Sequence, residues 1–565
     1  MRRSRPRLLL AALALLGAPL LHGAEFDVLI RNGLIVDGSG APPRIADVAL
    51  HGERIAAVGA DIAGRGALEL DATGFAVSAG FVDVESSAYE SLPQDGRGVS
   101  DITQGITLTI FGEEPHDLLD QRIRAEMLAG RNVDFDYPVT WNTLGGFLDF
   151  LEQRGVSENV ASLTGVTNIR KFVVGWDNRA PSAEELADMQ ELVRTAMREG
   201  AVGVGVCLSY DLAKFTSTAE LTAMAEAAGE FGGVYSTGLR SESGEVLAAL
   251  DEAITIGRAA GTRVIVNHFK VSGADHWNQL DAAIARVEAA RRDGVELYAA
   301  MYPYKALWTA LSSVLSPWAL DGGFESLLGR LREPVTRSRI LAELRAWSGG
   351  WDNYLALAGR PENVLFLRFK NRELNRLLGK TLADAARELG VTPEEAVLDL
   401  LVRNDGEIWS AFFTMSADNV RRQLALPWMM YGSDSMPVAA EEPFTRSLTH
   451  PRTYGSVARL FSDYARDGKV LTLQEAVRRL SALPAEVFGF RERGRLQPGF
   501  YADVVVFDPA TIEDHATFPD PHRYSTGVRD VFVNGTRVLK DGVHTGAKPG
   551  HVLRGPGWTG RRYAS

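Results

Sequence analysis

The stretch GFVDVESS at residues 80–87 decides the expected fold. It is a short apolar run that ends in polar side chains, and similar runs recur along the chain, each followed by a helical pattern. Alternating strands and helices indicate a parallel sheet, and over this length a (β/α)8 barrel is the leading closed form. The other runs of this kind lie at residues 106–114, 234–242, 264–270, 297–304 and 428–434.

In such a barrel the polar residues at the strand ends share one face, where the connecting loops converge and active sites lie. The barrel segment, residues 80–484, is much longer than the about 250 residues of a typical barrel. An insertion is therefore expected at about residues 308–405, which contain amphipathic helical stretches. Such an insertion suits either a lid over the barrel mouth or a peripheral buttress.

Both ends of the mature chain have the pattern of short β-hairpins. Alternating apolar and polar residues, broken by Asn-Gly and Asp-Gly turns, occur in residues 25–79 and again in residues 485–565. Two terminal segments of the same character predict one small β-sandwich domain built from both ends. The predicted fold class is therefore α/β, with a barrel, an insertion and a terminal β domain.

The chain of 565 residues carries 60 Lys and Arg against 72 Asp and Glu, a formal net charge of −12. General binding to nucleic acid or to an anionic membrane needs a positive field, so both classes are disfavoured. The single cysteine, Cys207, excludes a disulfide framework within the chain and a thiolate metal cluster. Metal chemistry would then rest on His and carboxylates, and Cys207 is interpreted as a small buried hydrophobe in a strand.

The first residues predict export. Basic residues precede an apolar run at residues 8–21, which is typical of a signal peptide over residues 1–24 and of a periplasmic protein. That run is shorter than the roughly 20 residues of a membrane-spanning helix. We expect no integral membrane segment in the mature chain, and the sequence leaves the oligomeric state open.

Motifs spread along the chain resemble those of one known family, the D-aminoacylase (N-acyl-D-amino-acid deacylase) family of the metal-dependent amidohydrolase superfamily. The resemblance spans essentially the whole mature chain, and it implies a distorted TIM barrel with a small β-sandwich. It also implies zinc-activated water that attacks an amide carbonyl, with an Asp as proton shuttle. The motifs are NG-x-x-x-DG at 32–38, GFVD at 80–83, QGIT at 104–107, HFK at 268–270, YPY at 302–304, GSD at 432–434, HPR-x-YG at 450–455 and the stretch 494–557.

The metal ligands that the resemblance implies are only partly present. Active members end the first barrel strand with Asp-x-His-x-His, but this chain has Glu85 and Ser87 in the two His positions. A further ligand His of a later strand is replaced by Gly238. Val166 and Ala300 also stand where the family often has a His and an Asp. Five departures in one pocket argue against a single random loss.

Other family positions are retained. His268 matches a barrel ligand, Asp434 matches the catalytic Asp, and Glu114 matches the bridging Cys or Glu. Glu85, Glu114, His268 and Asp434 could together bind one divalent ion. This carboxylate-rich set suits manganese, magnesium or iron as well as zinc. The alternative is a metal-free site in which Glu85 and Glu114 pair with cations such as Arg240 or Lys270.

The positions that bind the substrate in the family are better preserved in this chain than the metal-ligand positions. Lys270, Tyr302 and Arg452 match positions that face the substrate carboxylate in the family, and an Arg fork with a Lys charge suits a carboxylate. Arg240 is a further substrate-binding candidate, with an ion pair to Glu242 as its structural alternative.

The first hypothesis is therefore a hydrolase of carbon–nitrogen bonds other than peptide bonds. It would cleave the linear amide of an N-acyl-(D-)amino-acid-like substrate through an altered mononuclear metal site, with Asp434 as proton carrier. The second is an inactive relative that binds an acylated amino acid or a cell-wall fragment. The third is metal-free acid–base chemistry by Asp434 with Glu85 or Glu114. Sequence leaves the acyl group, the side chain and the stereochemistry open.

Overall fold

The computed structural model describes residues 24–113, 117–130, 135–210 and 212–560. The predicted signal peptide lies outside them except for its last residue, and Glu114 also lies outside the described residues. Within the described ranges, no helix combines the length and the apolar character needed to cross a bilayer.

The centre of the molecule is a distorted parallel barrel, as predicted. Its strands form two arcs instead of one continuous hydrogen-bonded ring. All neighbouring strands in both arcs are parallel. The first arc contains β6 (Phe81–Ser86), β7 (Ile106–Phe111) and β8 (Asn159–Ser162), and the second contains β9 (Thr164–Gly165), β10 (Gly203–Cys207), β11 (Val234–Gly238), β12 (Val264–Val266), β13 (Leu297–Met301) and β17 (Met429–Tyr431).

The two arcs meet at both of their edges. On one side only Leu163 separates β8 from β9 along the chain. On the other side Ser86 of β6 forms a parallel bridge with Ser435, and the Asp434 amide donates to the Glu85 carbonyl at 2.8 Å. These irregular contacts bring the ends of the first and last barrel strands together, and they place Glu85 and Asp434 side by side.

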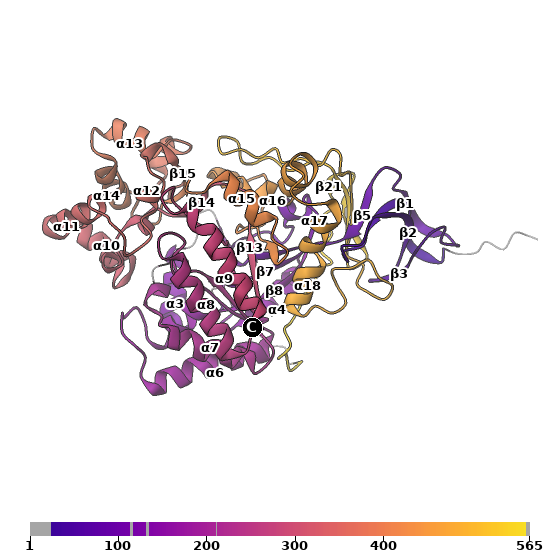
Figure 1. The fold of residues 1–565 in the computed structure, drawn as a ribbon, viewed down its shortest axis with the longest axis horizontal. Helices are drawn as coiled ribbons and strands as arrows, with labels where there is room; N and C mark the ends of the chain where they lie inside the picture. Colours follow the sequence, from indigo (N-terminus) through magenta and orange to yellow (C-terminus); the bar gives the residue numbers. More distant parts are fainter. Residues whose placement is uncertain (1–23, 114–116, 131–134, 211, 561–565) are drawn as a thin grey trace, which may run out of the picture.

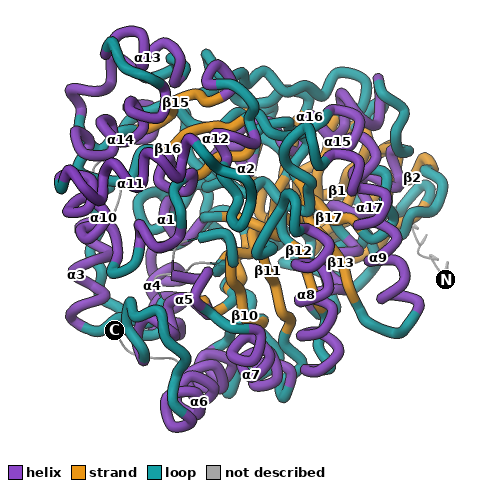
Figure 2. Tube along the Cα trace, turned by 60° about the vertical axis from the view of Figure 1, so that its left-hand side comes forward, coloured by secondary structure: helices purple, strands orange, loops and turns teal. Residues whose placement is uncertain are grey.

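Helices cover the outside of the second arc, so its strands are buried on both faces (Figure 2). Parallel strands that are buried on both faces consist of continuous apolar residues, and this is why the barrel strands could be predicted from apolar runs in the sequence. The covering helices are α6 (Ala183–Glu199), α7 (Thr218–Gly229), α8 (Val246–Ala260) and α9 (Leu280–Arg292). Capping boxes begin α6 at Ser182 and α7 at Ser217, and each satisfies the amides of the capping Ser and of the Glu three residues later.

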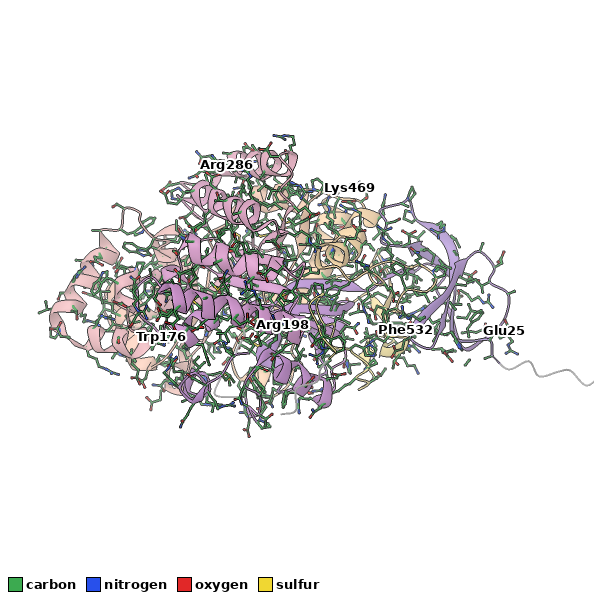
Figure 3. All side chains as sticks on the ribbon, turned by 90° about the horizontal axis from the view of Figure 1, so that it is seen from below. Glu25, Trp176, Arg198, Arg286, Lys469 and Phe532 are labelled. Atoms are coloured by element: carbon green, nitrogen blue, oxygen red, sulfur yellow. The ribbon has the colours of Figure 1, made fainter. Side chains whose placement is uncertain are left out.

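Shorter helices complete the barrel. They are α1 (Ala88–Ser91), α2 (Val99–Ile102), α3 (Gln121–Gly130), α4 (Leu144–Arg154), α5 (Val166–Val173), α15 (Ala417–Leu424), α16 (Arg452–Arg459), α17 (Leu473–Leu480) and α18 (Ala482–Phe488). Charged side chains such as Arg286 of α9 project from the outer surface (Figure 3).

The two ends of the chain share one nine-stranded sheet, at the end of the molecule opposite the insertion (Figure 1). The joint is the antiparallel pair β5 and β18, in which Ala79 lies opposite Val504. Apolar residues of both segments, including the fully buried Phe532, form its core. The strands are β1 (Phe26–Val36), β2 (Arg44–His51), β3 (Arg54–Gly59), β4 (Gly66–Asp71), β5 (Ala76–Ala79), β18 (Val504–Phe507), β19 (Val528–Val533), β20 (Thr536–Lys540) and β21 (Val543–His544).

The expected insertion contains helices and also a sheet that the sequence did not predict. Its three strands pair antiparallel around β16, and its helices enclose a separate apolar core. Asp352 of this segment accepts hydrogen bonds from the Ser241 hydroxyl at 2.8 Å and the Glu242 amide at 2.7 Å, beyond the end of β11. The elements are β14 (Leu307–Ala310), α10 (Gly323–Arg332), α11 (Pro334–Arg345), α12 (Tyr354–Leu357), β15 (Val364–Arg368), α13 (Leu382–Leu389), α14 (Pro393–Asn404) and β16 (Trp409–Phe412).

A buried polar cluster joins the terminal sheet to the barrel. Asp503, which precedes β18, forms an ion pair with Arg493, and their side chains are only 6% and 5% exposed. Arg493 donates to Asn534 at 2.9 Å, and Asn159 of β8 donates to the Thr107 carbonyl at 2.9 Å and approaches Asp503 at 3.3 Å. Every charge in this cluster therefore has a partner within the protein.

The first prediction concerns this cluster. Asp503→Ala should lower the free energy of unfolding by about 3–5 kcal/mol, because Arg493 is left buried without a counter-charge. Urea unfolding followed by circular dichroism measures the change. Glu492→Ala is the matched control, since Glu492 pairs with Arg54 in an ion pair with 57% and 40% exposed side chains, and it should have little effect. Equal effects of the two substitutions would contradict the structural role of Asp503.

The second prediction concerns Glu158, just before β8. Both carboxyl oxygens are buried without a hydrogen bond, and burial raises the pKa of Glu158 from 4.5 to about 8. The folded protein thus keeps a proton that the unfolded chain releases near pH 4.5. This contribution to stability is complete below that pH and is lost as the pH rises towards 8.

Glu158→Gln should therefore flatten the pH dependence of stability between pH 5 and 8.5, by at most about 1.4 kcal/mol per pH unit. Urea unfolding at several pH values measures the slope. Glu492→Gln, an exposed carboxylate, should keep the slope of the parent protein, and an unchanged slope in Glu158→Gln would refute the assignment.

Candidate active site

Polar side chains gather where the barrel strands end. Glu85 lies at the end of β6, Glu113 follows β7, Cys207 ends β10 and His268 follows β12. His268 Nε2 lies 3.7 Å from Glu85 Oε1 and 3.8 Å from Cys207 Sγ. Glu113 Oε1 accepts from the Gly238 amide at 3.1 Å. The parallel strands therefore bring two carboxylates, a thiol and an imidazole to one place.

A second group of charges is buried beside the first. Lys270 donates to Glu242 at 2.6 Å and to the His268 carbonyl at 3.0 Å, and His268 Nδ1 closely contacts the same Glu242 oxygen. Burial alone would raise the pKa of Glu242, but the charges of Lys270 and His268 lower it to about 2. Burial and Lys270 oppose protonation of His268, yet Glu242 and Glu85 raise its pKa well above the usual value. Glu242 is thus the shared counter-charge of Lys270 and His268.

Arg452, Asp434 and Tyr302 form a third group. Arg452 Nη1 lies 2.7 Å from Asp434 Oδ2, and the Arg452 guanidinium lies 4.5 Å from the centre of the Tyr302 ring. Arg452 is 1% exposed, and neither its Nε nor its Nη1 makes a well-directed hydrogen bond. The Tyr302 hydroxyl has no hydrogen-bond partner either. The Asp434 side chain, at 20%, is the most exposed of the three.

Two of these residues have unusual backbone conformations. Asp434 has φ 50° and His268 has φ 36°, in the left-handed region that non-glycine residues rarely adopt. Local strain of this kind concentrates at functional sites, where the surrounding structure holds it. At Asp434, the hydrogen bond of its amide to the Glu85 carbonyl is part of that support.

The carboxylates of the first group favour a bound cation. Burial raises the pKa of Glu85 well above its usual value and also raises the pKa of Glu113, although His268 opposes both shifts. Glu85 Oε1 is buried without a hydrogen bond. Glu113, Cys207 and His268 each offer a ligand atom, and these atoms lie within 4.8 Å of one another. This set of donors fits one divalent ion, with Glu85 Oε1 as an adjacent fourth donor.

The predicted site residues have different outcomes. Glu85, His268, Lys270, Tyr302, Arg452 and Asp434 do lie around one centre. Arg240 does not join them, because it pairs with Glu252 at 2.9 Å and donates to the Lys214 and Thr216 carbonyls. The alternative pair of Arg240 with Glu242 is not formed, since Glu242 pairs with Lys270. Glu114 lies outside the described residues, and its neighbour Glu113 accepts hydrogen bonds from Gly238 and Asn267 in the site.

Three residues of the site, Glu113, Cys207 and Glu242, were not among the predicted site residues. Cys207 is buried in a strand, as expected, but its sulfur contacts Ser209 Oγ at 3.1 Å and His268, so it is not simply a hydrophobe. The sequence does contain a feature that identifies Cys207 as a site residue, because Cys207 ends an apolar run of the kind that marks barrel strands. Residues in that position face the barrel mouth.

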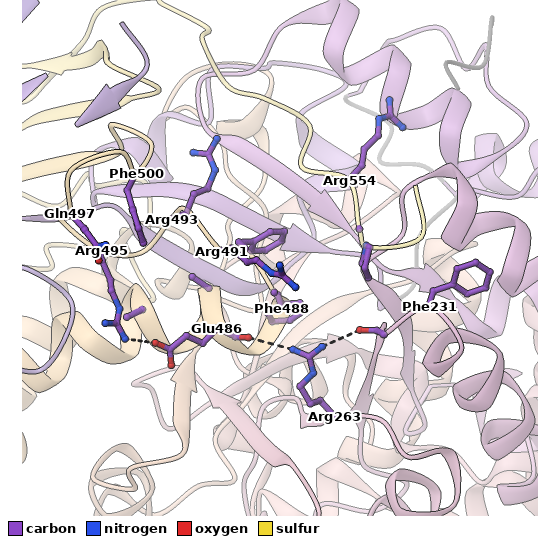
Figure 4. Close-up of a pocket in the computed structure, with 17 residues that line it drawn as sticks. Phe231, Arg263, Glu486, Phe488, Arg491, Arg493, Arg495, Gln497, Phe500 and Arg554 are labelled. Atoms are coloured by element: carbon purple, nitrogen blue, oxygen red, sulfur yellow. Dashed lines mark hydrogen bonds and ion pairs between the residues drawn. The ribbon is translucent and has the colours of Figure 1, made fainter. Parts of the chain in front are cut away.

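A cavity of about 900 Å³ lies elsewhere on the molecule (Figure 4). Gly232 and Arg263, which line it, precede β11 and β12, so it is at the opposite end of the barrel from His268. Arg263 donates to the Gly232 and Val487 carbonyls, and Arg495 pairs with Glu486. This end of a barrel serves stability, and the cavity is not the catalytic pocket.

Comparisons with known proteins agree with the barrel fold. A model of the amidohydrolase family matches residues 378–539. The chain is 31% identical to a D-aminoacylase and to an N-acyl-D-glutamate deacylase of Alcaligenes xylosoxydans xylosoxydans. Each match covers 94% of this chain and 97% of the relative.

Solved structures give the same result. The N-acyl-D-glutamate deacylase of Bordetella bronchiseptica, solved with zinc and a phosphonate mimic of the tetrahedral intermediate, matches with a TM-score of 0.76 and 31% identity. That match covers 94% of this chain and 99% of the other. A D-aminoacylase described with a binuclear metal centre, one-metal activation and second-metal attenuation matches with a TM-score of 0.76 and 29% identity, over 94% of this chain and 100% of that one.

The third prediction concerns the buried charges. Glu242→Gln should lower the free energy of unfolding by about 3–5 kcal/mol, because Lys270 would remain buried without its counter-charge. The double variant Glu242→Gln/Lys270→Met should lose less than the sum of the two single losses, since it removes both charges. Glu252→Gln, which removes the partner of the 32% exposed Arg240 side chain, is the matched control. Additive losses in urea unfolding would show that Glu242 and Lys270 do not act as a pair.

Proposed function

Because the chain belongs to the D-aminoacylase (N-acyl-D-amino-acid deacylase) family of the amidohydrolase superfamily, we propose that it hydrolyses the linear amide bond of an N-acyl amino acid. The observation that carries the proposal is the adjacency of two groups in one buried site. Lys270, Tyr302 and Arg452 form a cationic wall, and Glu85, Glu113, Cys207 and His268 form a set of metal donors beside it.

The cationic wall suits the carboxylate of an N-acyl amino acid. Arg452 is held against the Tyr302 ring, and its Nε has no hydrogen-bond partner, while Nη1 pairs with Asp434. A guanidinium of this kind can bind a carboxylate through two parallel hydrogen bonds. Lys270 Nζ lies 5.8 Å from the centre of the same ring and adds a second positive charge. A substrate carboxylate bound here would fix the amide relative to the donor set.

Asp434 is placed to move the proton. Arg452 orients its carboxylate, and its partial exposure leaves it accessible to water and substrate. It would accept a proton from the attacking water and deliver it to the amine nitrogen as the carbon–nitrogen bond breaks. Glu85, Glu113, Cys207 and His268 would hold a divalent ion, which would supply Lewis-acid chemistry for the amide carbonyl and for water.

We propose one metal ion instead of two. Ser87 and Gly238 stand where two family ligands would be, and the described residues offer one set of donors. The D-aminoacylase described with one-metal activation provides a precedent among the relatives. We further propose that the protein is exported, on the basis of the leader-like residues 1–24.

The fourth prediction concerns the pair of Arg452 and Asp434. Arg452→Met should raise KM for N-acyl amino acids by about 10–100-fold, because a charged hydrogen bond contributes about 1.5–3 kcal/mol. Asp434→Asn should instead lower kcat by about 10²–10⁴-fold. Steady-state assays of metal-loaded protein with acetyl and longer acyl derivatives of both D- and L-amino acids measure these effects.

Arg459→Met is the matched control, because Arg459 lies on the same helix but pairs with Asp514. It should leave both constants near those of the parent protein. If metal-loaded protein binds N-acyl amino acids without any turnover, the hydrolase proposal fails and the non-catalytic relative becomes the correct assignment.

A further inference from the structure

We propose that the Cys207 thiolate is a ligand of the metal ion and replaces the side chain that is missing at Gly238. This inference concerns the same site as the proposed function, but it rests on the geometry of two neighbouring strands. It makes the site a mixed carboxylate, thiolate and imidazole centre, although the sequence alone suggested a site without sulfur.

The space at Gly238 lies among the donor atoms. A Cβ atom added to Gly238 would lie 2.8 Å from Cys207 Sγ, 3.0 Å from His268 Cε1 and 3.1 Å from Glu113 Oε1. A side chain from this position would therefore enter the middle of the donor set. The Cys207 sulfur already occupies part of that space, and glycine at 238 is what leaves room for it.

The strand register explains how the sulfur reaches this point. Cys207 and Gly238 are the last residues of β10 and β11, and they lie opposite each other in a parallel pair. Cys207 on β10 therefore lies one strand away from position 238 on β11, where the family has its ligand. The carboxyl ends of adjacent parallel strands share one face, so the displaced donor can still reach the same centre.

The distances around His268 fit a shared ion better than direct hydrogen bonds. Its Nε2 faces Cys207 Sγ at 3.8 Å and Glu85 Oε1 at 3.7 Å. Metal–ligand bonds of about 2.0–2.3 Å place two ligand atoms of one tetrahedral ion about 3.3–3.8 Å apart. Glu85 Oε1 is buried without a hydrogen bond, so it lacks the partner that a metal ion would supply.

The donor types also specify the kind of ion. A thiolate and an imidazole favour zinc or cobalt over magnesium or manganese, which prefer oxygen ligands. On binding, the Cys207 thiol releases its proton to solvent as the sulfur–metal bond forms. We therefore expect zinc to be bound in preference to manganese, in contrast to a site of three carboxylates and one His.

Cobalt spectroscopy tests the inference directly. The chain has one cysteine, so any thiolate-to-cobalt charge-transfer band in the near ultraviolet must come from Cys207. Metal-free mature protein titrated with Co²⁺ should develop this band at about one ion per chain. Cys207→Ser should abolish the band and weaken binding by at least about 100-fold, because even groups behind a ligand change affinity by about 10–100-fold.

Val206→Ala, a core substitution next to Cys207 on the same strand, is the matched control and should keep the band. Cobalt binding without the band, equal affinity in Cys207→Ser, or no metal binding at all would each overturn the inference. If circular dichroism shows that Cys207→Ser does not fold, the rate of alkylation of Cys207 in the parent protein tests the inference instead. Bound zinc should protect the thiol by at least about tenfold in rate, since a coordinated thiolate is less available. An unchanged alkylation rate would overturn the inference.

A ligand transfer separates this inference from the proposed function. Cys207→Ala/Gly238→His should regain metal binding relative to Cys207→Ala alone, without the charge-transfer band, because the donor returns to β11. Failure of this rescue would argue against a shared position for the two donors. A charge-transfer band in a protein that deacylates no N-acyl amino acid would uphold the thiolate ligand and refute the proposed function. Turnover without the charge-transfer band would support the proposed function and refute the thiolate ligand.

Discussion

The parallel alignment of the barrel strands is the constraint on which the rest of the structure depends. Since all barrel strands run in one direction, their carboxyl ends open onto one face, and residues far apart in the sequence meet there. Glu85 and Asp434, at the first and last strands, become neighbours through the hydrogen bond between their backbones. The same register sets Cys207 opposite Gly238, so the donor set is a consequence of strand pairing.

Because charged side chains converge on one buried face, each needs a counter-charge, and the site provides for this in two ways. On one side, Glu242 is the shared counter-charge of Lys270 and His268, and Arg452 pairs with Asp434, so each of these charges has a partner within the protein. On the other side, burial keeps the pKa values of Glu85 and Glu113 high, so their carboxylates need protons or a cation. The site therefore has a cationic half, with Lys270 and Arg452 beside Tyr302, that suits a carboxylate ligand and a carboxylate-rich half that suits a metal ion.

The domains around the barrel support this face from different directions. The terminal sheet is anchored at the other end of the barrel by Asp503, Arg493 and Asn159, away from the chemistry. The insertion has its own core and touches the loop after β11 through Asp352, beside Glu242. A substitution in the insertion can thus reach the cationic half of the site, whereas one in the terminal sheet acts through stability.

The sequence by itself determined the barrel fold, and six of the residues it singled out, Glu85, His268, Lys270, Tyr302, Asp434 and Arg452, lie around one centre in the structure. These features depend on local patterns, since buried parallel strands are apolar and their ends are polar whatever lies beside them. It could not place the sheet within the insertion, whose strands β14 and β16 are about a hundred residues apart along the chain.

Only the tertiary structure decided how the charges pair and which donors converge. Arg240 was predicted to bind a substrate carboxylate. In the folded protein it forms an ion pair with Glu252, and Glu242 forms one with Lys270. Cys207 was indistinguishable from a core residue until the register of β10 and β11 placed its sulfur in the space at Gly238. Pairing across strands depends on three-dimensional proximity, and a one-dimensional pattern of residue types does not contain it.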